Sequence, residues 1–171
     1  MLLRPAQPDD ALAVARVHVR AWQAGYRGLL PDAYLDALRA EDRARRYTFD
    51  LIAPDRPHTL VAADGDAILG FATTLPAPDL PGTGELAALH VDPSAWRRGI
   101  GTALITAARA RLLDLGFATA IVWVMAGNRR AEQFYLADGW LLDDARRTDE
   151  VWGAQVDELR YRRERWSVDR R

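Results

Sequence analysis

The apolar run ATAIVWVMA, residues 118–126, constrains the fold of this chain more than any other segment. It holds no charged or amide side chain, so a strand formed from it is apolar on both faces and must be covered on both. Helical patterns flank the run at residues 101–116 and 128–139. Because each face of such a strand needs a covering layer, the run predicts an α+β domain with a central sheet and helices on both faces.

Six further segments have the patterns of strands. Residues 2–6, LLRPA, form a short first strand that is stopped by Pro5. Residues 58–76 are two strands joined at Asp64-Gly65, a pair typical of hairpin turns. The next strand is ELAALHV, residues 85–91, and two closing strands at 140–146 and 154–163 are joined by a turn near Gly153. The sequence therefore predicts a mixed sheet of about seven strands.

Three helical segments are expected between the first and second strands. Residues 9–23 carry apolar side chains at helical spacing after Asp9 or Asp10, either of which suits an N-cap. A short helix opens at Pro31. The charged segment at residues 40–52 is a third helical piece, so this part of the chain forms one long helix and shorter, more polar ones.

Two helices flank the apolar run, and their ends are marked by capping residues. Gly116 closes the helix before the run, while Asn128 caps and Gly139 ends the helix after it. The charged residues 143–150 are expected as a solvent-facing loop. The resulting order is β-α-α-β-β-β-α-β-α-β-β, in a single domain over residues 1–165 with a tail at 166–171.

Composition excludes several kinds of chemistry. The chain of 171 residues has neither cysteine nor lysine, so all 23 basic side chains are arginine. Disulfides, thiolate zinc sites, a cysteine nucleophile, a lysine Schiff base and the usual P-loop are thereby excluded, and no metal site is expected. With a net charge of −1, no general attraction to nucleic acid or membrane is expected. The first ten residues lack the apolar core of a signal peptide, which indicates a cytoplasmic protein.

The segment DPSAWRRGIG, residues 92–101, places glycines where a helix should begin. The first N–H groups of a helix have no intrahelical partner and carry partial positive charge. Gly99 and Gly101 allow an anion to approach these donors closely, and Arg97 and Arg98 add charge at the rim. The segment therefore suits a phosphate or diphosphate, although a tight strand-to-helix turn with solvated arginines explains the same residues. A dinucleotide fingerprint does not fit, because a third glycine is missing and the loop after Val91 is too long.

Two segments together resemble the GNAT superfamily of N-acetyltransferases. They are ELAALHVDPSAWRRGIGTALI, residues 85–105, and NRRAEQFYLADGW, residues 128–140, and the element order agrees from Leu2 to about Arg162. The resemblance implies that acetyl-CoA is a co-substrate, that its diphosphate lies on the glycine loop, and that its pantetheine arm lies between two splayed parallel strands. The cofactor-binding residues that it implies are Leu89, His90, Val91, Arg97, Arg98, Gly99, Ile100, Gly101, Thr102, Asn128 and Tyr135.

One position departs from the family pattern. Trp96 stands where many members carry glutamine or arginine, so Arg97 or Arg98 is expected to supply the polar contact to the diphosphate. The assignment of residues from the family resemblance also leaves simpler, structural roles open. Asn128 serves as a helix cap, with or without a contact to the cofactor arm.

The resemblance also implies two catalytic residues. Glu85 matches the position of a general base, acting directly or through a water; the alternative is a solvated residue at a strand end. His90 is a second candidate base, or a strand residue on the opposite face. Tyr135 matches the general acid that protonates the leaving thiolate; the alternative is a core aromatic. Because the chain has no cysteine, an acetyl-cysteine intermediate is excluded and direct transfer in a ternary complex is expected.

The acceptor is less well defined by the sequence. His18, Trp22, Tyr26 and Arg27 could line a pocket for an amine-bearing, anionic acceptor, although core packing competes for Trp22. A small-molecule amine or a peptide N-terminus is the expected acceptor, and a homodimer is consistent with the resemblance. The competing hypothesis is a non-catalytic acyl-CoA-binding or regulatory module. A nucleotide-binding domain of another type is disfavoured by the missing lysine and by the hairpin order.

Overall fold

The central sheet has seven strands in the order β1-β2-β3-β4-β5-β7-β6. A computed structural model describes residues 1–164, so the predicted tail at 166–171 and the last residue of the predicted domain lie outside the described residues. The strands are β1 (Leu2–Pro5), β2 (His58–Asp64), β3 (Ala67–Pro76), β4 (Gly84–Val91), β5 (Thr119–Met125), β6 (Leu141–Val151) and β7 (Ala154–Glu164). The helices are α1 (Ala11–Gly25), α2 (Asp32–Asp36), α3 (Ala40–Ala44), α4 (Ile100–Asp114) and α5 (Arg129–Ala137).

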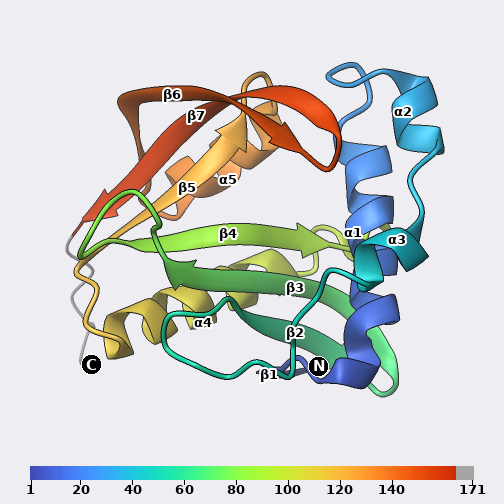
Figure 1. The fold of residues 1–171 in the computed structure, drawn as a ribbon, viewed down its shortest axis with the longest axis horizontal. Helices are drawn as coiled ribbons and strands as arrows, with labels where there is room; N and C mark the ends of the chain where they lie inside the picture. Colours follow the sequence, from blue (N-terminus) through green and yellow to red (C-terminus); the bar gives the residue numbers. More distant parts are fainter. Residues whose placement is uncertain (165–171) are drawn as a thin grey trace.

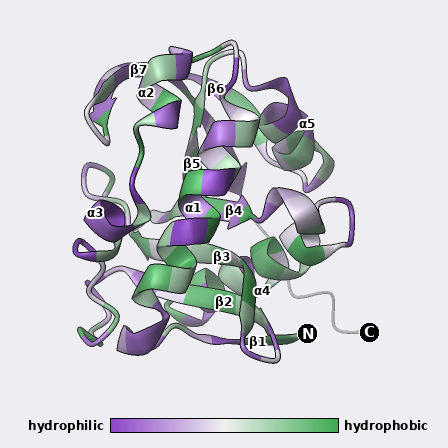
Figure 2. Ribbon diagram, turned by 90° about the vertical axis from the view of Figure 1, so that its right-hand side faces the viewer, coloured by the Kyte–Doolittle hydropathy of each residue, from purple (hydrophilic) through white to green (hydrophobic). Residues whose placement is uncertain are grey.

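Helices cover both faces of the sheet, as the apolar run at residues 118–126 predicts. One face carries α1, α2 and α3, and the other carries α4 and α5 (Figures 1 and 2). The largest apolar cluster lies under α4 and α5 and includes Leu104, Val122 and Trp140, and a second lies under α1 around Val17 and Phe71. Among the strands of residues 1–164, only β4 and β5 are parallel neighbours. The predicted α+β class and the mixed seven-stranded sheet are confirmed. Within residues 1–164, no helix has both the length and the apolar character that crossing a membrane would require.

The helix ends around the apolar run are confirmed. Gly116 and Gly139 follow the last residues of α4 and α5 with φ of 91° and 84°, the left-handed conformation that glycine adopts readily. The side chain of Asn128 accepts a hydrogen bond from the amide of Ala131 at 3.3 Å, which caps α5. At α1, by contrast, Asp10 occupies the N-cap position without capping. Its carboxylate instead accepts from the Arg4 guanidinium.

Two predicted segments differ from the structure. The third helical piece, expected to reach residue 52, ends at Ala44, because the chain is then anchored by Tyr47 and Phe49, whose rings stack at 4.8 Å and pack on the cluster under α1. Residues 143–150, expected as a solvent-facing loop, lie in β6. Their charges are paired with β7: Arg147 contacts Glu158 at 2.9 Å, and Asp143 contacts Arg160 at 2.7 Å.

The parallel pair β4–β5 is joined over only two positions. Gly84 pairs with Ala120 and Glu85 with Ile121, and beyond them the strands diverge towards their carboxyl ends (Figure 1). On its other side β4 pairs with β3 along its whole length. The edge of β4 that faces β5 therefore has no strand partner after Glu85, and a wedge-shaped gap opens inside the sheet.

A β-bulge in β4 changes which side chains share a face. Thr74 pairs with Leu86 but Thr73 pairs with Ala88, so Ala87 is an extra residue. Strict alternation would place Glu85 and His90 on opposite faces of the sheet. The bulge places both on the face that α1 covers, and this overturns the expectation that His90 lies on the opposite face.

Candidate active site

A cavity of about 720 Å³ occupies the gap between β4 and β5. Ten of the eleven predicted cofactor-binding residues line it; the exception is Arg98. Of the two predicted catalytic residues, Tyr135 lines the cavity and Glu85 does not. Of the predicted acceptor-side residues, His18, Trp22 and Tyr26 line it, and Arg27 does not. The lining also includes residues that the sequence analysis did not select, among them Arg43, Arg130 and Glu158.

The glycine loop presents unpaired amides to one end of the cavity. The first α-helical hydrogen bond at this end runs from the amide of Ala103 to the carbonyl of Gly99, so the amides of Ile100, Gly101 and Thr102 have no intrahelical acceptor. Gly99 has φ of 78°, and Arg97 adopts φ of 62°, which is uncommon for a residue with a Cβ. Such left-handed residues in a turn orient successive amides into an anion-binding concavity. This end of the cavity therefore fits a phosphate or diphosphate.

Trp96 contributes a ring and no free donor to this end. Its indole N–H donates to the carbonyl of Val91 at 2.8 Å, so it is not available to a ligand. The guanidinium of Arg130, from the first turn of α5, stacks at 3.4 Å over the Trp96 ring. The polar group that Trp96 lacks is thus replaced at the same end of the cavity by a cation from another element. Sequence analysis missed Arg130 because its proximity to Trp96 depends on how α5 packs.

Tyr135 lies where the gap meets the α5 side of the sheet. Its side chain is buried in the main apolar cluster, where its ring meets those of Phe134 and Trp140 edge-on. Burial, reinforced by the nearby Tyr26 and Asp138, raises the pKa of the Tyr135 phenol. The hydroxyl therefore stays protonated at neutral pH and can act as a proton donor.

Two carboxylates lie on the face of the sheet that α1 covers, and burial raises the pKa of both. Glu85 is half-buried, and no ion pair to it is found within residues 1–164; burial raises its pKa, Arg147 opposes that shift, and Glu158 reinforces it. Glu158 is buried in the cavity wall and accepts a hydrogen bond from Arg147 at 2.9 Å. Burial is also the main cause of the raised pKa of Glu158. The sequence does not distinguish Glu158 from its charged neighbours, because its inward position follows from the pairing of β7 with β5 opposite Met125.

His90 stacks on His18 with ring centroids 4.6 Å apart, at the α1 side of the cavity. His18 Nδ1 is 3.0 Å from the hydroxyl of Tyr47. Burial, with the nearby cations Arg43 and Arg130, lowers the pKa of His90 to about 3. Both histidines are neutral at pH 7, and accepting a proton is unfavourable for them. His90 is therefore poorly suited to act as a base that must become charged.

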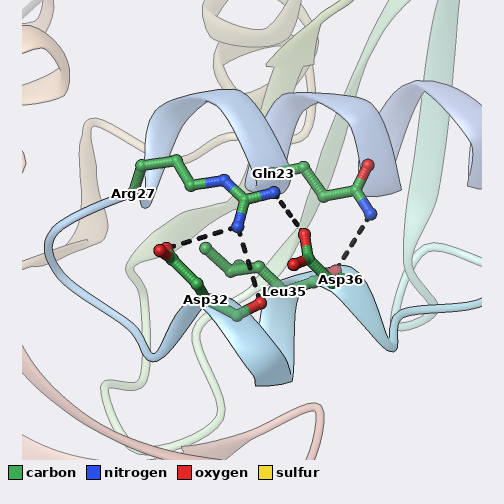
Figure 3. Close-up of polar contacts among 5 residues, drawn as sticks. All are labelled: Gln23, Arg27, Asp32, Leu35 and Asp36. Atoms are coloured by element: carbon green, nitrogen blue, oxygen red, sulfur yellow. Dashed lines mark hydrogen bonds and ion pairs between the residues drawn. The ribbon is translucent and has the colours of Figure 1, made fainter.

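Arg27, the arginine that sequence analysis placed in the acceptor pocket, lies outside it. Its guanidinium forms ion pairs with Asp36 at 2.6 Å and Asp32 at 3.3 Å, across the turn between α1 and α2 (Figure 3). Gln23, in α1, donates to the carbonyl of Leu35 at 2.9 Å (Figure 3). Arg27 therefore fastens α2 to the end of α1, and Arg43 of α3 is an arginine that does line the cavity.

The sequence profile of the "Acetyltransferase (GNAT) family" matches residues 19–140, which include the glycine loop, the gap and α5. The chain belongs to the GNAT family. Membership agrees with the element order and with the two motifs, and it makes the protein an acetyltransferase by family. The residues that the match does not cover include β7 and therefore Glu158.

Relatives and solved structures agree with this assignment. The chain is 29% identical over 133 residues to the uncharacterized N-acetyltransferase YuaI of Bacillus subtilis, covering 74% of this chain and 72% of that protein. It is 33% identical over 129 residues to a mycothiol acetyltransferase of Saccharopolyspora erythraea, covering 74% of this chain but only 38% of that longer protein. The structure of the PaiA N-acetyltransferase of Thermoplasma acidophilum, solved in complex with coenzyme A, superposes with a TM-score of 0.69 at 17% identity, covering 96% and 98% of the two chains. At this identity the superposition shows a shared fold.

Within this GNAT chain the cavity has two chemically different ends. The glycine-loop end offers backbone amides with Arg97 and Arg130. The opposite end, under α1 and the β6–β7 turn, offers aromatic rings, two neutral histidines, Arg43 and Glu158. Tyr135 and Asn128 come from α5 and its cap. An anionic group fits the first end, and a smaller, partly apolar molecule fits the second.

Proposed function

We propose that this protein transfers the acetyl group of acetyl-CoA directly to a primary amine, on a small molecule or a peptide N-terminus, in the cytoplasm. The observation that carries the proposal is the interruption of the sheet: β4 and β5 pair at two positions and then leave a cavity that reaches the unpaired amides of α4. Family membership supports the chemistry.

The residues present fit acetyl-CoA. The amides of Ile100, Gly101 and Thr102 suit its diphosphate, with Arg97 and Arg130 as the nearby cations. Arg98 is exposed and outside the cavity lining, so the contact expected of it falls to Arg130. Backbone groups of Leu89 and Val91, on the unpaired edge of β4, suit the amides of the pantetheine arm. When bound, acetyl-CoA supplies an electrophilic thioester carbonyl and a thiolate leaving group.

The acceptor-side residues have distinct tasks in this proposal. An amine reacts only when it is neutral, so a base must take its proton. Glu85 has a raised pKa and no ion-pair partner within the described part of the chain, which suits a proton acceptor that works through a water molecule. Glu158 is held by Arg147 and lies in the cavity wall, where its negative charge attracts an ammonium group and positions it. Tyr135 keeps its proton and donates it to the departing thiolate.

The proposal is tested by incubating the pure protein with acetyl-CoA and a panel of primary amines while thiol release is measured. We expect amine-dependent thiol release, and a higher melting temperature with acetyl-CoA but not with ATP or NAD. A melting shift without thiol release across the panel would instead favour the non-catalytic acyl-CoA-binding module. Absence of both responses would contradict the proposed function.

A further inference from the structure

Arg43 is the cation at the acceptor end of the cavity. It lies on α3, a helix of five residues between the long α1 and the edge of the sheet. Its guanidinium carbon is 5.3 Å from the centroid of the Trp152 ring, at the tip of the β6–β7 hairpin, and 5.5 Å from that of Tyr47. The Tyr47 hydroxyl lies 3.0 Å from Nδ1 of His18; burial raises its pKa, and the nearby Arg43 opposes that shift. The side chain is thus held in place by aromatic neighbours while facing the cavity.

Arg43 lacks the carboxylate partner that neighbouring arginines have. Arg27 pairs with Asp32 and Asp36, and Arg147 pairs with Glu158. No carboxylate within residues 1–164 forms an ion pair with Arg43, and its buried Nε atom has no hydrogen-bond partner there. A partly buried guanidinium that is stacked but not neutralised retains its capacity for two parallel hydrogen bonds to a carboxylate.

The surroundings of Arg43 leave its positive charge uncompensated. His18 and His90 are the nearest titratable groups from α1 and β4; the Arg43 charge contributes to their lowered pKa values, and both are neutral at pH 7. The carboxylate of Glu158, from β7, is already held by Arg147. The acceptor end therefore combines Arg43, which forms no ion pair within residues 1–164, with the carboxylate of Glu158, which can attract an ammonium group.

We infer that the acceptor is a small amino-acid-like molecule, whose free carboxylate is bound by Arg43 and whose amine points to Glu158 and the gap. The inference rests on the proposed function and narrows it. A peptide N-terminus has no free carboxylate close to its amine, so the presence of Arg43 favours a free amino acid over a peptide. The alternative is a structural Arg43 that only fastens the β6–β7 turn to α3 through its rings.

The test compares each amino acid with its own carboxamide, which keeps the amine and the side chain and removes the carboxylate charge. Initial rates of thiol release are measured for phenylalanine, leucine, glycine and 4-aminobutyrate, and for their carboxamides, with the wild type and with Arg43→Met. We expect that Arg43→Met lowers the ratio of kcat/KM for acid over amide by about tenfold or more, as loss of a charge-assisted pair implies. Differences in amine basicity cancel, because both proteins meet the same substrates.

Two control variants distinguish the effect of losing the Arg43 charge from the effect of disturbing the fold. Arg27→Met removes an exposed arginine that lies outside the cavity and should leave the ratio unchanged. Arg43→Lys keeps the positive charge but loses the planar guanidinium that can donate two parallel hydrogen bonds, and it should give an intermediate ratio. A ratio that is the same in Arg43→Met and the wild type would overturn the inference while leaving the proposed function intact.

Binding of the product gives a second readout that does not depend on turnover. With CoA present, N-acetylphenylalanine should raise the melting temperature of the wild type more than N-acetylphenylalanine amide does, and this difference should vanish in Arg43→Met. Equal shifts for acid and amide in the wild type would assign Arg43 the structural role only. Failure of the proposed function, by contrast, is an absence of thiol release with every amine.

Discussion

The two ends of the cavity are built in opposite ways. Most of the glycine-loop end comes from one continuous segment, the turn between β4 and α4, joined by Arg130 of α5, and its principal groups are backbone amides. The acceptor end is assembled from α1, α3, β4, β7 and the end of β6, and its principal groups are side chains. A ligand held by backbone tolerates many sequences, whereas a ligand held by side chains depends on each of them. The first end is therefore suited to a fixed co-substrate, and the second to a selected acceptor.

The largest effect is expected at the glycine-loop end of the cavity, from the variant Gly99→Glu. The variant places a side chain at φ of 78° and adds a negative charge beside the amides that face the diphosphate. We expect acetyl-CoA affinity to fall by about 100-fold or more, because the charge of a bound anion is then opposed directly. Titration calorimetry measures this change. Gly99→Ala, which adds backbone strain without charge, should lose much less, and retained binding in Gly99→Glu would place the diphosphate elsewhere.

Tyr135→Phe tests a residue that lies between the two ends. Removal of the hydroxyl should lower kcat by about 100-fold, the usual contribution of a positioned general acid. The Kd for acetyl-CoA should change little, because the ring still fills the same space in the apolar cluster. Steady-state kinetics and a separate binding titration distinguish these two quantities. Unchanged turnover would remove Tyr135 as the acid and leave it a packing residue.

On the acceptor side, the variants Glu85→Gln and Glu158→Gln should change different kinetic constants. Loss of the base should lower kcat by about tenfold or more for Glu85→Gln, with partial recovery as rising pH deprotonates the amine without help. Loss of the ammonium partner should mainly raise KM for Glu158→Gln. Rate profiles against pH separate the two. Equal kcat in Glu85→Gln and the wild type would transfer the base role to Glu158.

The last prediction concerns the stability of the protein against pH. The pKa of His90 is about 3 in the folded protein, and it returns to its ordinary value near 6.5 on unfolding. Between these values the unfolded state binds more protons, so the free energy of unfolding decreases as pH falls below about 6.5. The decrease should be on the order of 1 kcal/mol per pH unit for His90. His90→Asn should flatten the dependence measured by urea unfolding; an unchanged slope would mean that His90 does not contribute to it.

Prediction from sequence succeeded where local patterns decide the structure. The run at residues 118–126 indicated covering helices, Asp64-Gly65 indicated a hairpin, and Asn128, Gly116 and Gly139 marked helix ends. Ten of the eleven residues that the family resemblance implies as cofactor-binding line the cavity, since most of them sit in one loop or next to it in the chain; their contact with a cofactor stays a prediction. These features depend on residues a few positions apart, which the sequence displays directly.

Prediction failed where long-range packing decides the structure. Arg27 and Arg43 are both arginines on polar segments, and only the position of Asp32 and Asp36 shows that the first is engaged elsewhere. Glu158 faces the cavity because of strand register. The bulge at Ala87 overturned the expected face of His90, since an extra residue in one strand leaves no pattern that a single sequence reveals.

The short β4–β5 ladder has a mechanical consequence. The strands β5, β7 and β6 are joined to the rest of the sheet by two residue pairs, Gly84 with Ala120 and Glu85 with Ile121. Away from the ladder, the hydroxyl of Tyr34 donates to the carbonyl of Trp152, and the main apolar cluster holds side chains from both halves. A ligand whose own amides formed hydrogen bonds to the edges of both β4 and β5 would act as an eighth strand. Binding of such a ligand would therefore make the two halves of the sheet unfold as one cooperative unit.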